Sequence, residues 1–160
     1  GVLIYLAIYL FMNVGTFGCI MCMRRNGQAA EQITDLSGVS KTHPMMALAL
    51  MVFMDSMAGI PPLAGFFGKW GIFLAAIEAK LYALAIIGVI SSVVAAFYYL
   101  RIIKIMYFDE ISEPLDRGIS KNLRVVIYGS MTVVIIFFLS PGTLVSVATN
   151  AAKSLIGVNG

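Results

Sequence analysis

The sequence predicts an all-α, polytopic membrane protein with four transmembrane helices, the second of them broken near Gly59–Gly65. Two observations predict this class. Of the 160 residues, 60% are hydrophobic and only 12% are charged, whereas soluble domains are about half apolar and a quarter charged. The apolar residues also lie in long runs instead of being dispersed around a core. This composition argues against a soluble enzyme, intrinsic disorder and collagen-like repeats.

Four segments are long and apolar enough to cross a hydrocarbon core about 30 Å thick, which needs roughly 20 helical residues. They are 1–23, 45–77, 81–107 and 125–147, within a single membrane domain that covers 1–160. We expect helices because a backbone in lipid must satisfy its own hydrogen bonds, and runs of this length do not fit barrel strands. The chain starts inside the first run with no basic region before it, which does not fit a signal peptide. We therefore expect the C-terminal fragment of a longer protein.

The basic residues predict how these helices are oriented. If 24–44 lies on side X of the membrane, the turn at 78–80 falls on side Y, 108–124 on side X and the C-terminus on side Y. Side X then collects eight of the eleven basic residues: Arg24, Arg25, Lys41, Arg101, Lys104, Arg117, Lys121 and Arg124. Only Lys80 and Lys153 lie on side Y. The positive-inside rule makes X the cytoplasmic side, or the matrix side in a mitochondrion, so the net charge of +3 reflects topology and predicts no nucleic-acid partner.

The second segment is too long for a plain transmembrane helix. Its 33 residues would extend about 50 Å at 1.5 Å per residue, well beyond the thickness of the core. Pro61 and Pro62 each remove a backbone donor, and Gly59 and Gly65 on either side permit irregular dihedral angles. We predict two half-helices joined by an unwound middle. Discontinuous helices of this kind mark ion and substrate sites in transporters.

Three ionisable residues within or just before this segment are candidates for a site. Lys69 follows the break and lies about 15 Å from the end of the span, close to the midplane, where a lysine is costly and marks function more often than snorkelling to the interface. Asp55 precedes the break and is either a counter-ion to a neighbouring basic group or a carboxylate at the wet end of the first half-helix. His43, at the side X entry, either exchanges protons with solvent or is inert.

Other motifs favour structural interpretations. Gly65, Gly68 and Gly71 leave a thin strip for a neighbouring helix, which indicates packing more than binding. The C-x-x-C spacing of Cys19 and Cys22 lies in an uncharged helix and is not expected to bind metal. The segment 29–40 is expected to form a short interfacial helix or loop, and the acidic run within 109–116 a solvated loop.

Several sequence runs resemble one known family. These are 9–15 (Y-L-F-M-N-V-G), 41–44 (K-T-H-P), 58–69 (A-G-I-P-P-L-A-G-F-F-G-K) and 98–101 (Y-Y-L-R). They resemble the C-terminal part of the subunit N family of bacterial NADH-quinone oxidoreductase (respiratory complex I), whose mitochondrial counterpart is subunit 2. The resemblance covers nearly the whole chain, and the run 58–69 is its most specific part. Related antiporter-like subunits share the broken helix, but many differ at the position of Lys69.

The resemblance implies a fourteen-helix subunit with two inverted five-helix repeats, of which this chain holds the last four helices. Lys69 matches the lysine of the family's second broken helix, a proton carrier in a half-channel toward side Y. Asp55 departs from the family pattern, which has an apolar or small residue there. The membrane would be the bacterial inner membrane, with a mitochondrial inner membrane less favoured. The partners would be the lipid bilayer and other complex I membrane subunits, including neighbouring antiporter-like ones.

The resemblance also implies proton pumping driven by electron transfer from NADH to quinone. Both would be used in other subunits, because this chain has no nucleotide fingerprint, iron–sulfur cysteine set or flavin site and is expected to bind no cofactor or metal. One alternative is a cation/proton antiporter subunit that works without NADH or quinone. Another is a membrane scaffold in which Lys69 is dispensable.

Overall fold

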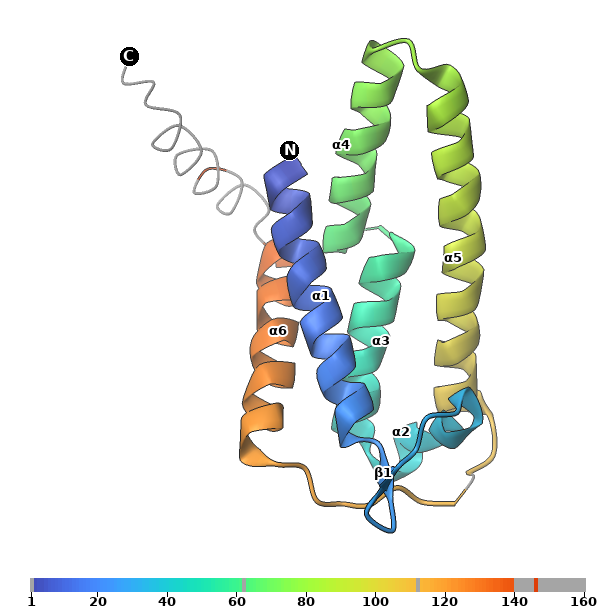
Figure 1. Ribbon diagram of the computed structural model, residues 1–160, viewed down its shortest axis with the longest axis vertical. Coiled ribbons are helices and arrows are strands. Elements are labelled where there is room, and N and C mark those ends of the chain that lie inside the picture. The colour runs from blue at the N-terminus through green and yellow to red at the C-terminus, as the bar shows by residue number, and fades with distance from the viewer. Residues whose placement is uncertain (1, 62, 112, 140–145, 147–160) are drawn as a thin grey trace.

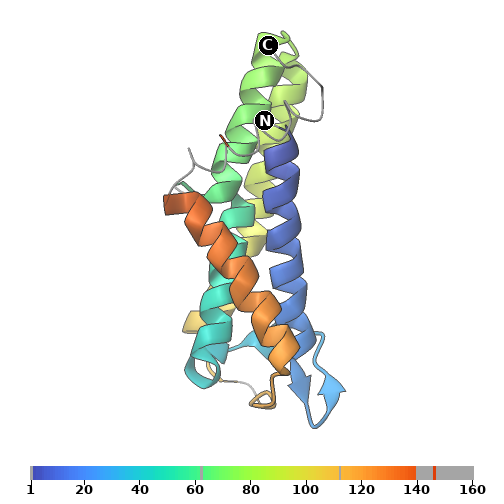
Figure 2. The ribbon, with the colours of Figure 1, turned by 90° about the vertical axis from the view of Figure 1, so that its left-hand side faces the viewer.

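The structure of the chain is a computed structural model that describes residues 2–61, 63–111, 113–139 and 146. Within these ranges it is a helical bundle with one small hairpin (Figure 1). The elements are α1 (Val2–Cys22), β1 (Arg24–Arg25), β2 (Gln28–Ala29), η1 (Ile33–Leu36), α2 (Val39–Thr42), α3 (Pro44–Ala58), α4 (Ala64–Glu78), α5 (Tyr82–Phe108) and α6 (Lys121–Leu139). Helix α4 continues the direction of α3, and α5 returns alongside both of them (Figure 1). Helices α1 and α6 pack against each other and against α3 (Figure 2).

The helix boundaries lie close to the predicted spans. The first and third spans correspond to α1 and α5, and the second is divided into α3 and α4. Helix α6 begins at Lys121, four residues before the predicted start of the fourth span. Ser120 precedes it, and the Ser120 hydroxyl accepts a hydrogen bond from the Leu123 N–H (3.4 Å), as serine does at the start of a helix. The predicted end of this span at 147, and Lys153, lie outside the described residues.

Helix length separates α5 from the other helices. In the described part of the chain, only Tyr82–Phe108 is long and apolar enough by itself to cross a membrane. Two apolar helices are shorter, Leu6–Cys22 and Pro44–Ala58. The 15 residues of α3 and the 15 of α4 each extend about 22 Å, so neither alone matches a hydrocarbon core of about 30 Å. The interruption therefore makes each half of the second predicted span short.

The core lies between α1, α3 and α6. Phe53 of α3 has no exposed surface and packs against Gly15 of α1, where even a Cβ would collide with the phenyl ring. Met12 is also buried in this core. The outer surface is apolar as well: on α5, Val93 is 65% exposed and Phe97 is 63% exposed. Large exposed apolar faces of this kind are expected where lipid or further helices cover the surface.

The two segments predicted for side X lie together at one end of the bundle. The hairpin β1–β2, η1, α2 and the linker from α5 to α6 gather there, and the turn between α4 and α5 lies at the opposite end (Figure 1). The hairpin turn has positive φ at Asn26 (52°) and Gly27 (77°), as two-residue hairpin turns require. The expected interfacial loop at 29–40 thus contains part of a hairpin and two short helical turns.

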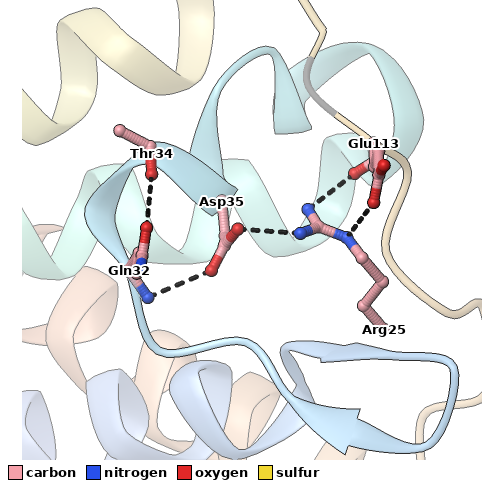
Figure 3. A network of polar contacts seen from close by, with 5 residues as sticks. All are labelled: Arg25, Gln32, Thr34, Asp35 and Glu113. Atoms are coloured by element: carbon pink, nitrogen blue, oxygen red, sulfur yellow. Dashed lines mark hydrogen bonds and ion pairs between the residues drawn. The ribbon is translucent and has the colours of Figure 1, made fainter.

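A polar cluster joins these segments (Figure 3). The guanidinium of Arg25 donates a hydrogen bond to the Asp35 carboxylate (2.9 Å) and another to the Glu113 backbone carbonyl (2.9 Å), and it lies 3.6 Å from the Glu113 carboxylate. The other Asp35 oxygen accepts the Gln32 N–H (3.0 Å). The Glu113 side chain is 80% exposed, which agrees with the expected solvated loop, while its backbone carbonyl anchors the linker to Arg25. Arg25 and Glu113 are 88 positions apart in the sequence, so their contact depends on the packing of the bundle.

Asp116 makes a second connection from the linker to the hairpin. Its two carboxylate oxygens accept hydrogen bonds from the backbone N–H groups of Asn26 (3.1 Å) and Gly27 (2.9 Å), and its own N–H donates to the Arg24 carbonyl (2.7 Å). The turn therefore receives two acceptors from one side chain. The linker that was expected to be a solvated loop is therefore anchored to the hairpin at Asp116.

We predict that Asp116→Ala loosens this end of the bundle. The substitution removes both acceptors, and because the turn is exposed, water replaces part of their contribution. A net loss of about 1 kcal/mol corresponds to roughly fivefold more frequent local opening. Trypsin cleavage at Arg117, followed over time in detergent-solubilised protein, measures that opening. Glu110→Ala is the control, because Glu110 is exposed in the same linker. Equal cleavage rates in the two variants would contradict the prediction.

Candidate functional site: the interrupted helix and Lys69

The interruption between α3 and α4 falls where the prolines and glycines predicted it. Helix α3 ends at Ala58, and α4 begins at Ala64. Gly59 adopts a left-handed conformation (φ 79°), which suits glycine because it has no Cβ. Pro61 lies in the connection, and Pro62 lies outside the described residues. Helix α3 therefore ends at Gly59 as many helices do, with a glycine in the left-handed region.

The carbonyl groups at the end of α3 are all accounted for. A helix leaves its last four carbonyls without partners from its own helix. The N–H of Gly59 donates to the Asp55 and Ser56 carbonyls, and the N–H of Ile60 donates to the Asp55 carbonyl, as in a glycine-terminated helix. The Lys69 Nζ donates to the remaining two carbonyls, those of Met57 (2.9 Å) and Ala58 (3.1 Å). The ammonium thus sits at the negative end of the α3 dipole, where a cation is favoured.

One backbone N–H at the beginning of α4 is satisfied from α3 in return. Leu63 precedes α4 and has no side-chain acceptor to offer its first N–H groups. The hydroxyl of Ser56, a fully buried side chain of α3, instead accepts the Gly65 N–H (3.2 Å). Gly65 is buried there, and a Cβ on it would collide with the Ser56 carbonyl oxygen. Each half-helix therefore supplies the polar group that the adjoining end of the other lacks.

Lys69 also borders a cavity of about 300 Å³ between the interruption, α4 and α5. The walls are mainly apolar, with Trp70, Phe73 and Val93 among them, and Ser92 of α5 adds a hydroxyl. Lys69 itself is half-buried. Its ammonium therefore combines fixed carbonyl partners with access to a space large enough to hold water or a side chain from outside the described residues.

The structure brings Asp55 toward this site but does not pair it with Lys69. The interruption folds the Lys69 ammonium back onto the carbonyls of residues 57 and 58, within about one helical turn of Asp55 along α3. A continuous helix would have separated the two residues by about 21 Å. Among the described residues, the ion pairs do not include Asp55. Its two interpretations as a counter-ion or a wet-end carboxylate both stay predictions.

In the structure, His43 and Lys69 lie far apart, at opposite ends of α3. His43 precedes α3, and about 20 Å of helix separates it from the carbonyls that bind Lys69. The His43 Nδ1 lies 3.1 Å from the Thr42 hydroxyl. A direct contact between His43 and Lys69 is therefore excluded in this conformation, and the suggested exchange of protons with solvent stays a prediction.

Sequence reasoning missed Ser56. The signal in the sequence is a serine seven positions before Leu63, a residue whose side chain cannot cap the helix that follows it. This signal can be interpreted only when the path of the chain between α3 and α4 is known, because that path brings Gly65 next to Ser56. The interpretation of the glycines as a packing strip agrees with the close packing of Gly65, whereas none of the described residues lies within 4 Å of a Cβ built on Gly71.

The fold and the site define a helical membrane protein whose interrupted helix carries a half-buried lysine. A family model described as "NADH:quinone oxidoreductase/Mrp antiporter, TM" matches residues 1–95, which include both half-helices. The chain belongs to this family.

Individual relatives agree with this assignment. The chain is 62% identical over 155 residues to NADH-quinone oxidoreductase subunit N of Rhodospirillum rubrum, and the match covers 97% of this chain and 32% of the relative. It is 55% identical over 160 residues to subunit N of Paramagnetospirillum magneticum, covering 100% of this chain and 33% of the relative. The chain thus spans about a third of the length of these curated relatives.

A solved structure is also similar. A chain of respiratory complex I from Thermus thermophilus superposes with a TM-score of 0.75 at 26% sequence identity, over 87% of this chain and 32% of that chain. The arrangement of the described helices is therefore similar to that of a chain of this complex. The predicted resemblance to the subunit N family is confirmed.

Proposed function

We propose that this chain is part of a proton-translocating membrane subunit of NADH:quinone oxidoreductase. The observation that carries the proposal is the position of Lys69, whose ammonium is held by the Met57 and Ala58 carbonyls at the interruption of a membrane helix. The relatives also support the proposal, because they are named as subunit N of NADH-quinone oxidoreductase. Electron transfer from NADH to quinone would take place in other subunits, and this chain would contribute to the pumping that the electron transfer drives.

In the proposed mechanism, Lys69 is the proton carrier. The carbonyls of α3 hold its protonated form, because an ammonium has three donors and favours the negative end of a helix. The proton would then leave toward side Y through the space between α4 and α5. Asp55 is proposed as a nearby counter-charge, and His43 as a group at the side X entry.

We further propose four spans at 1–23, 45–77, 81–107 and 125–147 in the bacterial inner membrane, with side X in the cytoplasm. The clustering of the loops at 24–43 and 109–120 at one end of the bundle supports this topology. Other complex I membrane subunits and lipid would cover the exposed apolar faces of α5.

The alternative is a cation/proton antiporter subunit that acts without NADH or quinone. The description of the family names antiporters together with the oxidoreductase. Purification of the assembly from its native membrane, in mild detergent, distinguishes the two. We expect NADH:quinone oxidoreductase activity to co-purify with this chain. An assembly that exchanges cations for protons and lacks NADH oxidation would overturn the proposal in favour of the alternative.

A further inference from the structure

The two half-helices cap each other, and this relation identifies a residue that positions Lys69. The Ser56 hydroxyl binds the first turn of α4, and Lys69 lies one turn further along the same helix, where its ammonium binds the last carbonyls of α3. The end of α3 and the beginning of α4 are therefore joined by two contacts, one from each helix.

We propose that Ser56 is a positioning residue for Lys69. Its hydroxyl fixes the beginning of α4 against α3, so that the Lys69 ammonium reaches the Met57 and Ala58 carbonyls. The inference rests on the proposed function of Lys69 as a proton carrier.

The geometry allows little freedom at this contact. Ser56 has no exposed surface, so water cannot replace its hydroxyl as the acceptor of the Gly65 N–H. The absence of a Cβ at Gly65 permits the close approach, and the stem of Lys69 lies against Gly59 on the other side of the connection. Loss of the hydroxyl would leave a buried donor unsatisfied and allow α4 to shift relative to the carbonyls.

Four side chains at position 56 separate the hydroxyl from side-chain size. Serine and threonine carry the hydroxyl, whereas alanine and valine lack it, and threonine and valine have nearly the same shape. In the assembled complex, we expect Ser56→Ala and Ser56→Val to lower proton pumping per NADH oxidised about fivefold, as expected for one lost hydrogen bond. Ser56→Thr should pump better than Ser56→Val. Ser130→Ala is the control, because Ser130 is also a buried serine but lies on α6.

The outcomes separate this inference from the proposed function. Wild-type pumping in Ser56→Ala, or equal pumping in the threonine and valine variants, would overturn the role of Ser56. If Lys69→Ala pumps normally, the proposed function fails whatever the Ser56 variants do. Reduced pumping that follows the hydroxyl, with assembly unchanged, would support the positioning role.

Discussion

Replacing Lys69 with alanine is expected to lower proton pumping coupled to NADH oxidation by about tenfold or more, because the proposed mechanism makes Lys69 the proton carrier. The measurement is quenching of a pH-sensitive dye by inverted membrane vesicles that oxidise NADH. The substitution also leaves the Met57 and Ala58 carbonyls without their donor, which costs about 1–3 kcal/mol for a buried group. The amount of assembled complex must therefore be measured in the same membranes.

Lys69→Arg separates helix capping from proton transfer. Arginine keeps the positive charge and the donors for the α3 carbonyls, but it does not release its proton at physiological pH. We expect assembly to survive and pumping to stay low. Lys80→Ala is the control, because Lys80 is exposed in the turn after α4. Normal pumping in both Lys69 variants would identify the chain as a scaffold.

The helices and their interruption could be predicted because they depend on local properties. Apolar runs, the charges between them and the pair of prolines each act over a few residues. The contacts of Lys69 could not be predicted, because they depend on the path taken after Gly59, which turns the ammonium back onto α3. The predicted depth in the membrane made Lys69 a candidate site residue, but it did not indicate the carbonyl partners of its ammonium.

The same reason explains why the contacts at the side X end were not predicted. Glu113 and Asp116 lie in a charged, proline-containing linker that is typical of a solvated loop. Their partners in the hairpin are about 90 positions earlier in the sequence and approach only when α1, α5 and α6 have packed. Composition describes such a linker correctly as polar, but it contains no information on distant partners.

Gly65→Ala is expected to disrupt the junction of the two half-helices. A Cβ at this position would collide with the Ser56 carbonyl oxygen and lie 2.8 Å from the Ser56 carbonyl carbon. These are backbone atoms within α3, so they cannot rotate away as a flexible side chain would. Helix α4 must shift instead, at a cost of about 1–3 kcal/mol, and the contacts of Ser56 and Lys69 across the junction are lost with it.

Thermal unfolding of the purified complex and the yield of assembled complex measure this effect. Gly71→Ala is a matched control on the same helix, because a Cβ built there has no neighbour within 4 Å in the described part of the chain. Alanine favours a helix over glycine by about 1 kcal/mol, so Gly71→Ala should be neutral or slightly stabilising. The two substitutions add the same methyl group to the same helix. A lower stability of Gly65→Ala alone would therefore arise from the contact with Ser56, whereas equal stabilities would show that the half-helices are not packed as closely as the structure indicates.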